Sequence, residues 1–254
     1  MNIAFISAIL PVALLLIFIY RKDKQQPEPL GKLILTFFVG CLSVIPASLM
    51  EAGLMLLAPS PETMPVLNGI FEGYCVAGFS EELCKLLLLL WVVWRSPHFD
   101  EYFDGIVYAV YLSLGFACVE NIGYVMQGND PMTTALMRGL LAVPAHFLFA
   151  VTMGYYLSLA KFDPAGRGKH LWRAFLFPVL LHGTYDALLM VSSNLGGSDS
   201  LFSTGLTVVL FILFVIFDIR MWKWGLRRIK RLQERSREQD FDRFRPFDGF
   251  IWNV

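Results

Sequence analysis

The residues with the clearest capacity for chemistry are two adjacent glutamates and a lysine inside an apolar run. The run extends from about residue 68 to residue 94 and contains Glu81, Glu82 and Lys85. Placing one ionised side chain at the centre of a bilayer costs about 3 kcal/mol on insertion scales, so such residues mark functional sites by default. On a helix, Lys85 lies four residues after Glu81 and three after Glu82, which places both acids beside its ammonium group. The pattern indicates a reactive acid–base group or a polar clasp between helices.

Two later apolar runs carry a glutamate and a histidine that packing alone does not require. Glu120 lies in the run from 104 to 126, and His146 lies in the next run. Because Pro144 has no backbone N–H to donate, we expect the helix to open just before His146. An imidazole gains or loses a proton near neutral pH, and a neighbouring carboxylate can set which of its nitrogens carries that proton. These two runs therefore add acid–base groups at membrane depth.

A further run contains His182 and Asp186, four residues apart. This spacing places both side chains on one helical face, where the carboxylate can orient the imidazole and fix its tautomer. We counted depth from the outer end of each run, at about 1.5 Å per helical residue. By this count five residues fall within roughly 10 Å of a common layer, namely Glu81, Glu82, Glu120, His146 and His182. Four helices that bring ionisable groups to one depth indicate a single shared site.

The elements that carry these residues are predicted to be membrane-spanning helices. The chain has 254 residues, of which 56% are hydrophobic and 17% charged, and its mean hydropathy is +0.56. This composition excludes an ordinary soluble domain. Each apolar run is long enough to cross a bilayer, which takes about 20 residues. The runs are 2–20, 33–58, 68–94, 104–126, 134–160, 172–193 and 202–221. The sequence therefore predicts an all-α integral membrane protein, a polytopic bundle of about seven transmembrane helices.

Lysine and arginine alternate between the loops. The loops after the first, third and fifth runs, and the segment after the last run, are basic. The loops 59–67, 127–133 and 194–201 contain no Lys or Arg. The positive-inside rule then places the N-terminus outside and the C-terminus in the cytoplasm.

The chain divides into a membrane domain and a tail. We expect residues 1–221 to form one membrane-embedded helical domain, with the motif-bearing core at about 70–190. We expect residues 222–254 to form a basic and aromatic cytoplasmic tail, which lies on anionic lipid or docks onto the bundle. The formal net charge is zero, so no global field points to nucleic acid as a partner. The four cysteines have no Cys-x-x-Cys spacing, so neither a disulfide framework nor a zinc ribbon is indicated.

Four short motifs follow one another along the core. They are Glu81-Glu82-x-x-Lys85, Phe116-x-x-x-Glu120, His146 with Gly154 eight residues later, and His182-x-x-x-Asp186. This ordered set resembles the PrsW family of intramembrane proteases, which is distantly similar to the CAAX-processing and Abi proteases. The resemblance implies an enzyme of the bacterial cell membrane that cleaves membrane-anchored proteins within or near the bilayer. In one branch of the family the substrate is an anti-sigma factor.

Peptide hydrolysis needs an activated water, a polarised carbonyl and a proton for the leaving amine. A buried glutamate beside a second acid can take a proton from water and later return it. By similarity to the CAAX proteases, Glu81 is expected to be the base and Glu120 to assist the water. His182 and Asp186 would then bind the oxyanion. An ionised Asp186 would repel that oxyanion, so it is expected to be protonated, to orient His182, or to face a metal.

The charge of this group leaves two solutions open. Lys85 is the only deep cation in the inferred site. When the four acids of the motifs are all ionised, their charges and that of Lys85 sum to −3. A mid-membrane site does not hold such a charge uncompensated. Protons on some of the acids give a glutamic protease without a cofactor, which we favour by similarity to the CAAX proteases. The alternative is a zinc ion bound by His146, His182 and Glu120, a two-His, one-Glu set.

Other classes of membrane protein also place acids and histidines at mid-membrane. A proton- or cation-coupled transporter does so, but it should show an inverted repeat, which we do not find in this sequence. A transferase or phosphatase for lipid-linked substrates would need several cations for phosphate, and Lys85 stands alone. We therefore predict a protease and keep the transporter as the alternative.

Overall fold

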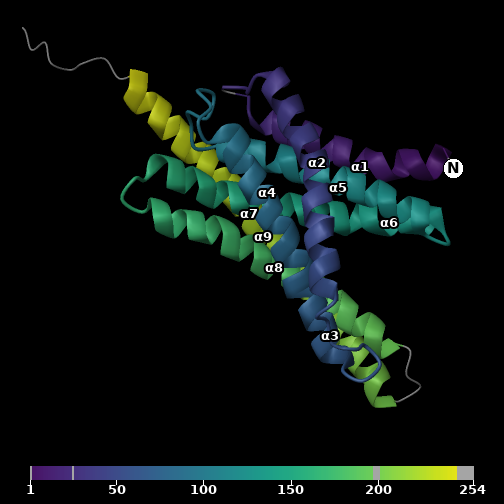
Figure 1. The fold of residues 1–254 in the computed structure, drawn as a ribbon. Coiled ribbons are helices and arrows are strands. Elements are labelled where there is room, and N and C mark those ends of the chain that lie inside the picture. Colours follow the sequence, from purple (N-terminus) through teal and green to yellow (C-terminus); the bar gives the residue numbers. More distant parts are fainter. Residues whose placement is uncertain (1, 25, 197–200, 245–254) are drawn as a thin grey trace, which may run out of the picture.

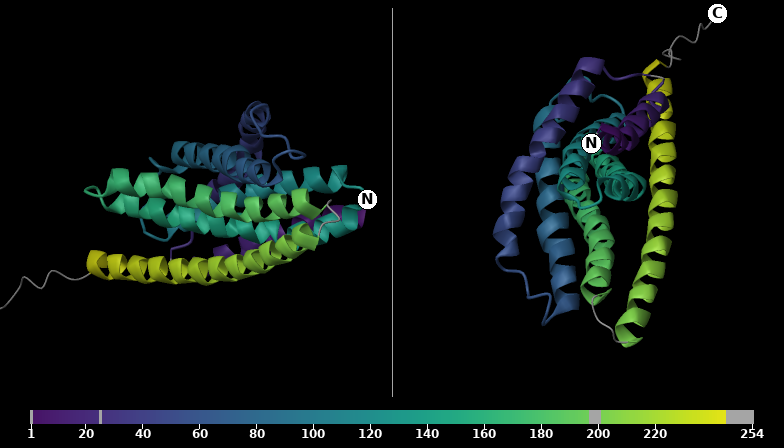
Figure 2. Two further views of the ribbon diagram at one scale, coloured as in Figure 1. Left: turned by 90° about the horizontal axis from the view of Figure 1, so that it is seen from below. Right: turned by 90° about the vertical axis from the view of Figure 1, so that its right-hand side faces the viewer.

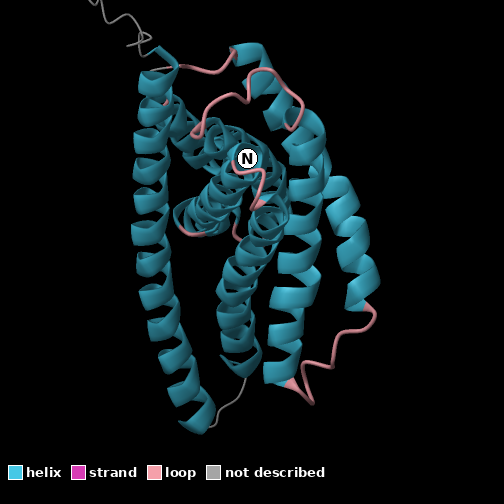
Figure 3. Cartoon of the chain, turned by 90° about the vertical axis from the view of Figure 1, so that its left-hand side faces the viewer, coloured by secondary structure: helices cyan, strands magenta, loops and turns pink. Residues whose placement is uncertain are grey.

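The computed structural model describes residues 2–24, 26–196 and 201–244, and these residues form a bundle of helices (Figure 1). In chain order the helices are α1 (Asn2–Lys22), α2 (Leu30–Met55), α3 (Pro65–Phe71), η1 (Glu72–Gly78), α4 (Phe79–Val93), α5 (Asp104–Gln127), α6 (Pro131–Leu140), α7 (Ala142–Phe162), α8 (Arg167–Gly196) and α9 (Leu201–Phe244). Within these described ranges the helices are joined only by loops, and no strand occurs (Figure 3). The predicted all-α class is confirmed.

The described residues contain the membrane-crossing segments that the sequence predicts. Six stretches are helical, long and apolar enough to cross a bilayer. A further segment is built from α3, η1 and α4, which follow one another without a break from residue 65 to residue 93. η1 is π-helical, a rare conformation that is frequent at functional sites. It ends three residues before Glu81. The chain is therefore a polytopic membrane protein; its orientation stays a prediction from the loop charges.

The fifth apolar segment is divided into two helices at Leu141. This residue lies between α6 and α7 and has a φ of −118°, outside the helical range. Pro144 has no N–H to bond the carbonyl group of Leu140, four residues earlier, so the break follows from the proline. His146 comes two residues after that proline, in the first turns of α7. The expected opening of the helix before the histidine is confirmed.

α5 and α7 form the buried centre of the bundle, and two glycines bring them together. A Cβ atom at Gly154 of α7 would lie 2.3 Å from the carbonyl oxygen of Gly105 of α5. A Cβ at Gly105 would lie 2.8 Å from the carbonyl oxygen of Gly154. No side chain fits between these backbones, so the glycine of the histidine motif serves close packing. The contact helps to fix the register of the helices that carry Glu120 and His146.

A second pair of glycines brings η1 against α8. A Cβ at Gly73 would lie 2.5 Å from the backbone nitrogen of Ala187, and one at Gly183 would lie 2.3 Å from Cδ1 of Tyr74. Gly183 directly follows His182 in the sequence. The close approach therefore places the face of α8 that carries the histidine beside the segment that leads into Glu81.

α9 is 44 residues long and continues well beyond residue 221, where the apolar run ends. Figure 2 shows it along one side of the bundle, with α2 on the other. Its polar half docks onto the loops at one end of the molecule. For example, the backbone N–H of Phe103 donates to Oγ of Ser236 at 2.9 Å. Docking onto the bundle is thus what the described part of the tail does. Residues 245–254, with Phe247, Phe250 and Trp252, lie outside the described residues.

Candidate active site

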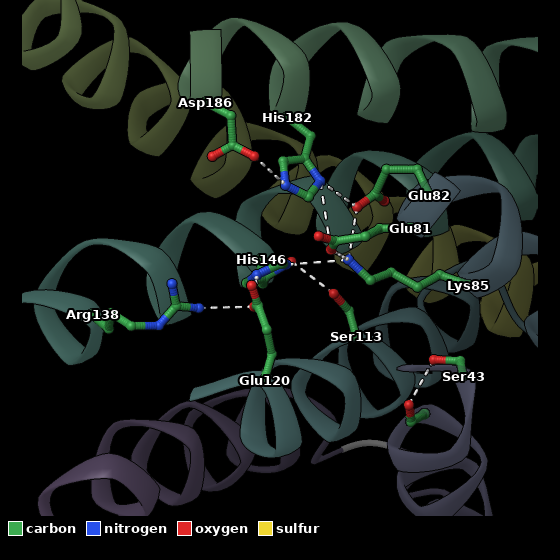
Figure 4. A network of polar contacts seen from close by, with 11 residues as sticks. Ser43, Glu81, Glu82, Lys85, Ser113, Glu120, Arg138, His146, His182 and Asp186 are labelled. Atoms are coloured by element: carbon green, nitrogen blue, oxygen red, sulfur yellow. Dashed lines mark hydrogen bonds and ion pairs between the residues drawn. The ribbon is translucent and has the colours of Figure 1, made fainter. Parts of the chain in front are cut away.

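Four helices deliver the polar residues of the sequence motifs to one place (Figure 4). α4 contributes a glutamate pair and a lysine, α5 a glutamate, α7 a histidine, and α8 a histidine and an aspartate. These residues are Glu81, Glu82, Lys85, Glu120, His146, His182 and Asp186. A continuous chain of hydrogen bonds and ion pairs joins them. The structure therefore brings together every residue that the sequence proposes for the site.

The ammonium group of Lys85 lies at the centre of this network. Its Nζ is 2.9 Å from Oε2 of Glu81, 2.9 Å from Oε1 of Glu82 and 3.2 Å from Nδ1 of His146. All three ammonium protons therefore have an acceptor. The same Nζ lies 4.0 Å from the centre of the Phe116 ring, within cation–π distance. This contact gives a role to the phenylalanine of the second motif.

The ring of His182 lies between two carboxylates. Its Nδ1 is 2.9 Å from Oε1 of Glu82, and its Nε2 is 3.1 Å from Oδ2 of Asp186. Each of these two contacts needs a proton, because two acceptors cannot form a hydrogen bond without a proton between them. Either both ring nitrogens carry a proton, or one nitrogen and one of the acids do. Phe149 of α7 stacks on the imidazole, with ring centres 4.7 Å apart and planes inclined by 19°. The stack and the two bonds fix the orientation of the ring.

His146 is held from its far side by Glu120 and, through it, by an arginine. Nε2 of His146 is 2.9 Å from Oε2 of Glu120, and Nη2 of Arg138 is 2.9 Å from the same oxygen. Arg138 belongs to α6 and also donates from Nε to Oδ1 of Asn121. The prediction that Lys85 is the only deep cation is therefore wrong. The lysine and arginine count along the loops could not find Arg138, because this residue lies inside an apolar run.

The group is closed on one side and more open on the other. Lys85 and Glu82 are fully buried, and Glu81 is 5% exposed. The side chains of Glu120 and Asp186 are 19% and 20% exposed. Both residues lie in the half of the membrane-crossing segment that the loop charges place toward the outside of the cell. The accessible surface of the site is therefore on the Glu120 and Asp186 side, while the carboxylate pair stays shielded.

The site contains a group of donor atoms that could bind a metal ion. Glu81, Glu82, His146 and His182 each offer one ligand atom, and these atoms all lie within 4.8 Å of one another. Glu120 is not in this convergent group, because it bonds the far nitrogen of His146. Imidazole nitrogens and carboxylate oxygens suit zinc. However, the lysine ammonium already bonds three of these four residues, so in this arrangement the place for a cation is taken.

Comparisons with known proteins agree with the arrangement of the motifs. A family model described as "PrsW family intramembrane metalloprotease" matches residues 28–217. "Protease PrsW" of Clostridioides difficile (strain 630) is 34% identical, over 95% of this chain and 96% of that protein. "Protease PrsW" of Bacillus subtilis (strain 168) is 36% identical, over 90% of this chain and 95% of that protein. No solved structure matches the chain.

Proposed function

This chain belongs to the PrsW family and is an intramembrane protease, for which we propose hydrolysis by a water molecule that Glu81 activates. The observation that carries the proposal is the convergence of a buried carboxylate pair, a lysine and two oriented imidazoles from three helices, α4, α7 and α8. The transporter alternative has no support from the relatives, which are named proteases. The peptidase needs a base, a group for the oxyanion and a proton for the amine, and the site offers each.

Glu81 is the better base of the two glutamates. Glu82 is fully buried, and its Oε1 lies 2.9 Å from both Lys85 and Nδ1 of His182. Oε2 of Glu81 also lies 2.9 Å from Nζ of Lys85, but it is 3.9 Å from Nδ1 of His182. Glu81 is also the more exposed of the two. The glutamate that is less enclosed and has fewer bonds to lose is the one that takes the proton.

The steps follow from these positions. Glu81 takes a proton from water as the water oxygen attacks the carbonyl carbon of the substrate. A doubly protonated His182, whose Nδ1 and Nε2 are bonded to Glu82 and Asp186, stabilises by its positive charge the negative charge that develops on the carbonyl oxygen. Glu81 then gives its proton to the leaving amine as the C–N bond breaks. Asp186 is engaged with Nε2 of His182, so it orients the ring and does not face the oxyanion. Glu120 holds His146 in the tautomer that accepts from Lys85.

The charges of the group support the form without a metal. The four acids contribute −4, and Lys85 and Arg138 contribute +2. A doubly protonated His182 between its two carboxylates adds +1, so the sum is −1. One proton on the Glu81–Glu82 pair then brings the site to neutrality, the condition that a buried group in a membrane requires; this proton has to be on Glu82 when Glu81 acts as the base. The charge that a divalent ion would supply thus comes from the chain itself.

A metalloprotease is the second candidate, because the family model carries that description and four donor atoms converge. Zinc would need Lys85 to withdraw from Glu82 and His146. It would then be held by these two residues with His182, and it would polarise the carbonyl group and acidify the water. Removal of zinc by a chelator separates the two forms, because only the metalloprotease would lose its activity. We propose membrane-anchored proteins as substrates of either form, and the anti-sigma factor class among them.

The experiment that tests the base is a comparison of glutamine variants in purified enzyme. Glu81→Gln keeps size and hydrogen bonding but cannot take a proton. It should abolish cleavage of a single-pass model substrate and leave the melting temperature close to that of the wild type. Glu72→Gln, in η1, is the matched control and should keep full activity. Near-normal turnover by Glu81→Gln would reject the assignment.

A further inference from the structure

A second group of buried acids lies away from the catalytic residues. It is formed by the loop between α1 and α2 and by the loop that leads into α5. The members are Asp23, Glu28, Glu101 and Asp104, which are between 0% and 5% exposed. The loop charges place this end of the bundle in the cytoplasm. The proteolytic mechanism uses none of these four residues.

Three of the four acids point into one common space. Asp23, Glu101 and Asp104 each offer one oxygen, and these oxygens all lie within 4.8 Å of one another. Within the described part of the chain, no lysine, arginine or histidine forms an ion pair with any of the three. Burial raises the pKa of Asp23 to about 6. Burial, together with the neighbouring carboxylates, raises the pKa of Glu101 to about 7.

Two oxygens in this space accept no N–H group of the described residues. Oδ2 of Asp104 accepts backbone N–H groups from Asp100 at 3.0 Å and from Glu101 at 2.8 Å. Its second oxygen, Oδ1, is buried and accepts no N–H group of the described residues, and the carboxyl group of Asp104 also forms a side-chain hydrogen bond with Glu28. Oε2 of Glu101 is likewise buried and accepts no N–H group of these residues. Buried polar atoms are nearly always satisfied, so two carboxylate oxygens without such a donor, beside a third carboxylate, point to a missing positive ligand.

We propose that Asp23, Glu101 and Asp104 bind a hard divalent cation, Ca²⁺ or Mg²⁺. All the donors are oxygens, which these ions prefer, and no imidazole or thiol takes part. Two oxygens on opposite sides of a Ca²⁺ ion lie about 4.8 Å apart, at roughly 2.4 Å each from the ion. The three oxygens, none more than 4.8 Å from another, are close enough to surround one such ion.

The proposed cation fastens the cytoplasmic end of the bundle. It joins the α1–α2 loop, through Asp23, to the loop that leads into α5, through Glu101. The docked part of α9 lies against the end of α1, next to Asp23, and against the loop that leads into α5. Gln233 donates to the carbonyl oxygen of Lys22 at 2.7 Å, and Gln239 donates to that of Asp100 at 3.0 Å. Binding of the ion thus stabilises the contact between α9 and the core without a role in peptide hydrolysis.

The test uses full-length protein in nanodiscs of zwitterionic lipid, freed of metals with a chelator. Thermal unfolding is followed by tryptophan fluorescence as CaCl₂ or MgCl₂ is added. At about a hundredfold excess over the dissociation constant, one of the two salts should raise the melting temperature of the wild type by about 5 °C or more. Glu101→Gln and Asp23→Asn should lose this shift. Glu234→Gln changes a glutamate whose side chain is 55% exposed and should keep it.

Two controls keep the result interpretable. Glu82→Gln must also keep the shift, because this excludes the catalytic group as the place of binding. In chelator, Glu101→Gln should melt at or above the wild-type temperature, because it removes a repulsion among buried acids. That result also shows that the variant folds. An unchanged wild-type melting temperature with either salt would overturn the proposal, and so would an equal shift in Glu101→Gln. Stabilisation by acid but by neither cation would overturn it in favour of shared protons.

Discussion

Oδ2 of Asp186 lies 3.1 Å from Nε2 of His182, one helical turn earlier on α8. The bond leaves Nδ1 of the same ring directed at Glu82, 2.9 Å away. The i, i+4 spacing on one helix thus produces a carboxylate that orients an imidazole toward a second carboxylate. An aspartate in this place does not conflict with an oxyanion, because its charge is directed at the ring.

Asp186→Asn should keep the size of the side chain and remove its charge. The imidazolium form of His182 loses one of its two anionic partners, and the asparagine can impose the wrong tautomer. We expect kcat for a single-pass substrate to fall by about 10²-fold to 10⁴-fold, by analogy with charge removal behind a catalytic histidine. KM should change little. An Asp186→Asn enzyme with normal kcat would show that the bond to His182 has no part in catalysis.

Lys85→Met removes the cation that lies between two buried carboxylates. Breaking a buried ion pair by deleting one partner costs about 3 to 5 kcal/mol, because the remaining charge is uncompensated. We expect a clear fall in the melting temperature. The double variant Lys85→Met/Glu81→Gln, which also removes one of the acids, should recover part of the loss. If the double variant is no more stable than Lys85→Met, the loss comes from packing and not from the unpaired acids.

Gly73→Ala tests how η1 positions the site. The new Cβ would lie 2.5 Å from the backbone nitrogen of Ala187, so α8 has to move away from η1. We expect activity to fall more than tenfold, because the imidazole of α8 then lies too far from the glutamate pair; a displacement of about 1 Å can cost 10²-fold. Gly53→Ala, where a Cβ meets open space, is the matched control and should have the same activity as the wild type. Equal activity of both variants would refute this role for the close approach.

The sequence was sufficient to predict which motif residues converge in the structure, but not Arg138 beside them. A charge in an apolar run is costly, so Glu81, Lys85 and His182 were visible as exceptions. The spacing along one helix also predicted local pairs correctly, such as Lys85 with Glu81 and Asp186 with His182. These contacts depend only on helical geometry.

Contacts between different helices could not be predicted from the sequence. Arg138 pairs with Glu120 across a helix–helix turn, and Phe149 stacks on His182 from another helix. Neither contact follows from periodicity, because each depends on how two helices pack and on side-chain rotamers. The π-helical turn before Glu81 has the same origin, since it forms where η1 packs closely against α8. The full length of α9 could not be predicted from the apolar run, because the polar half of this helix is stabilised by docking and not by apolar composition.

The most direct test of the central claim is the activity of enzyme from which zinc has been removed. That claim is that Lys85 is the resident cation of the site and that Glu81 activates water without a metal. Purified protein is treated with a zinc-selective chelator in buffer that retains Mg²⁺ and Ca²⁺, so that the proposed cytoplasmic cation site stays filled. Zinc is then measured by mass spectrometry, beside cleavage of a single-pass substrate. We predict that the zinc-free enzyme keeps most of its activity. Loss of activity that stoichiometric zinc restores would contradict the account and assign Glu82, His146 and His182 to a metal.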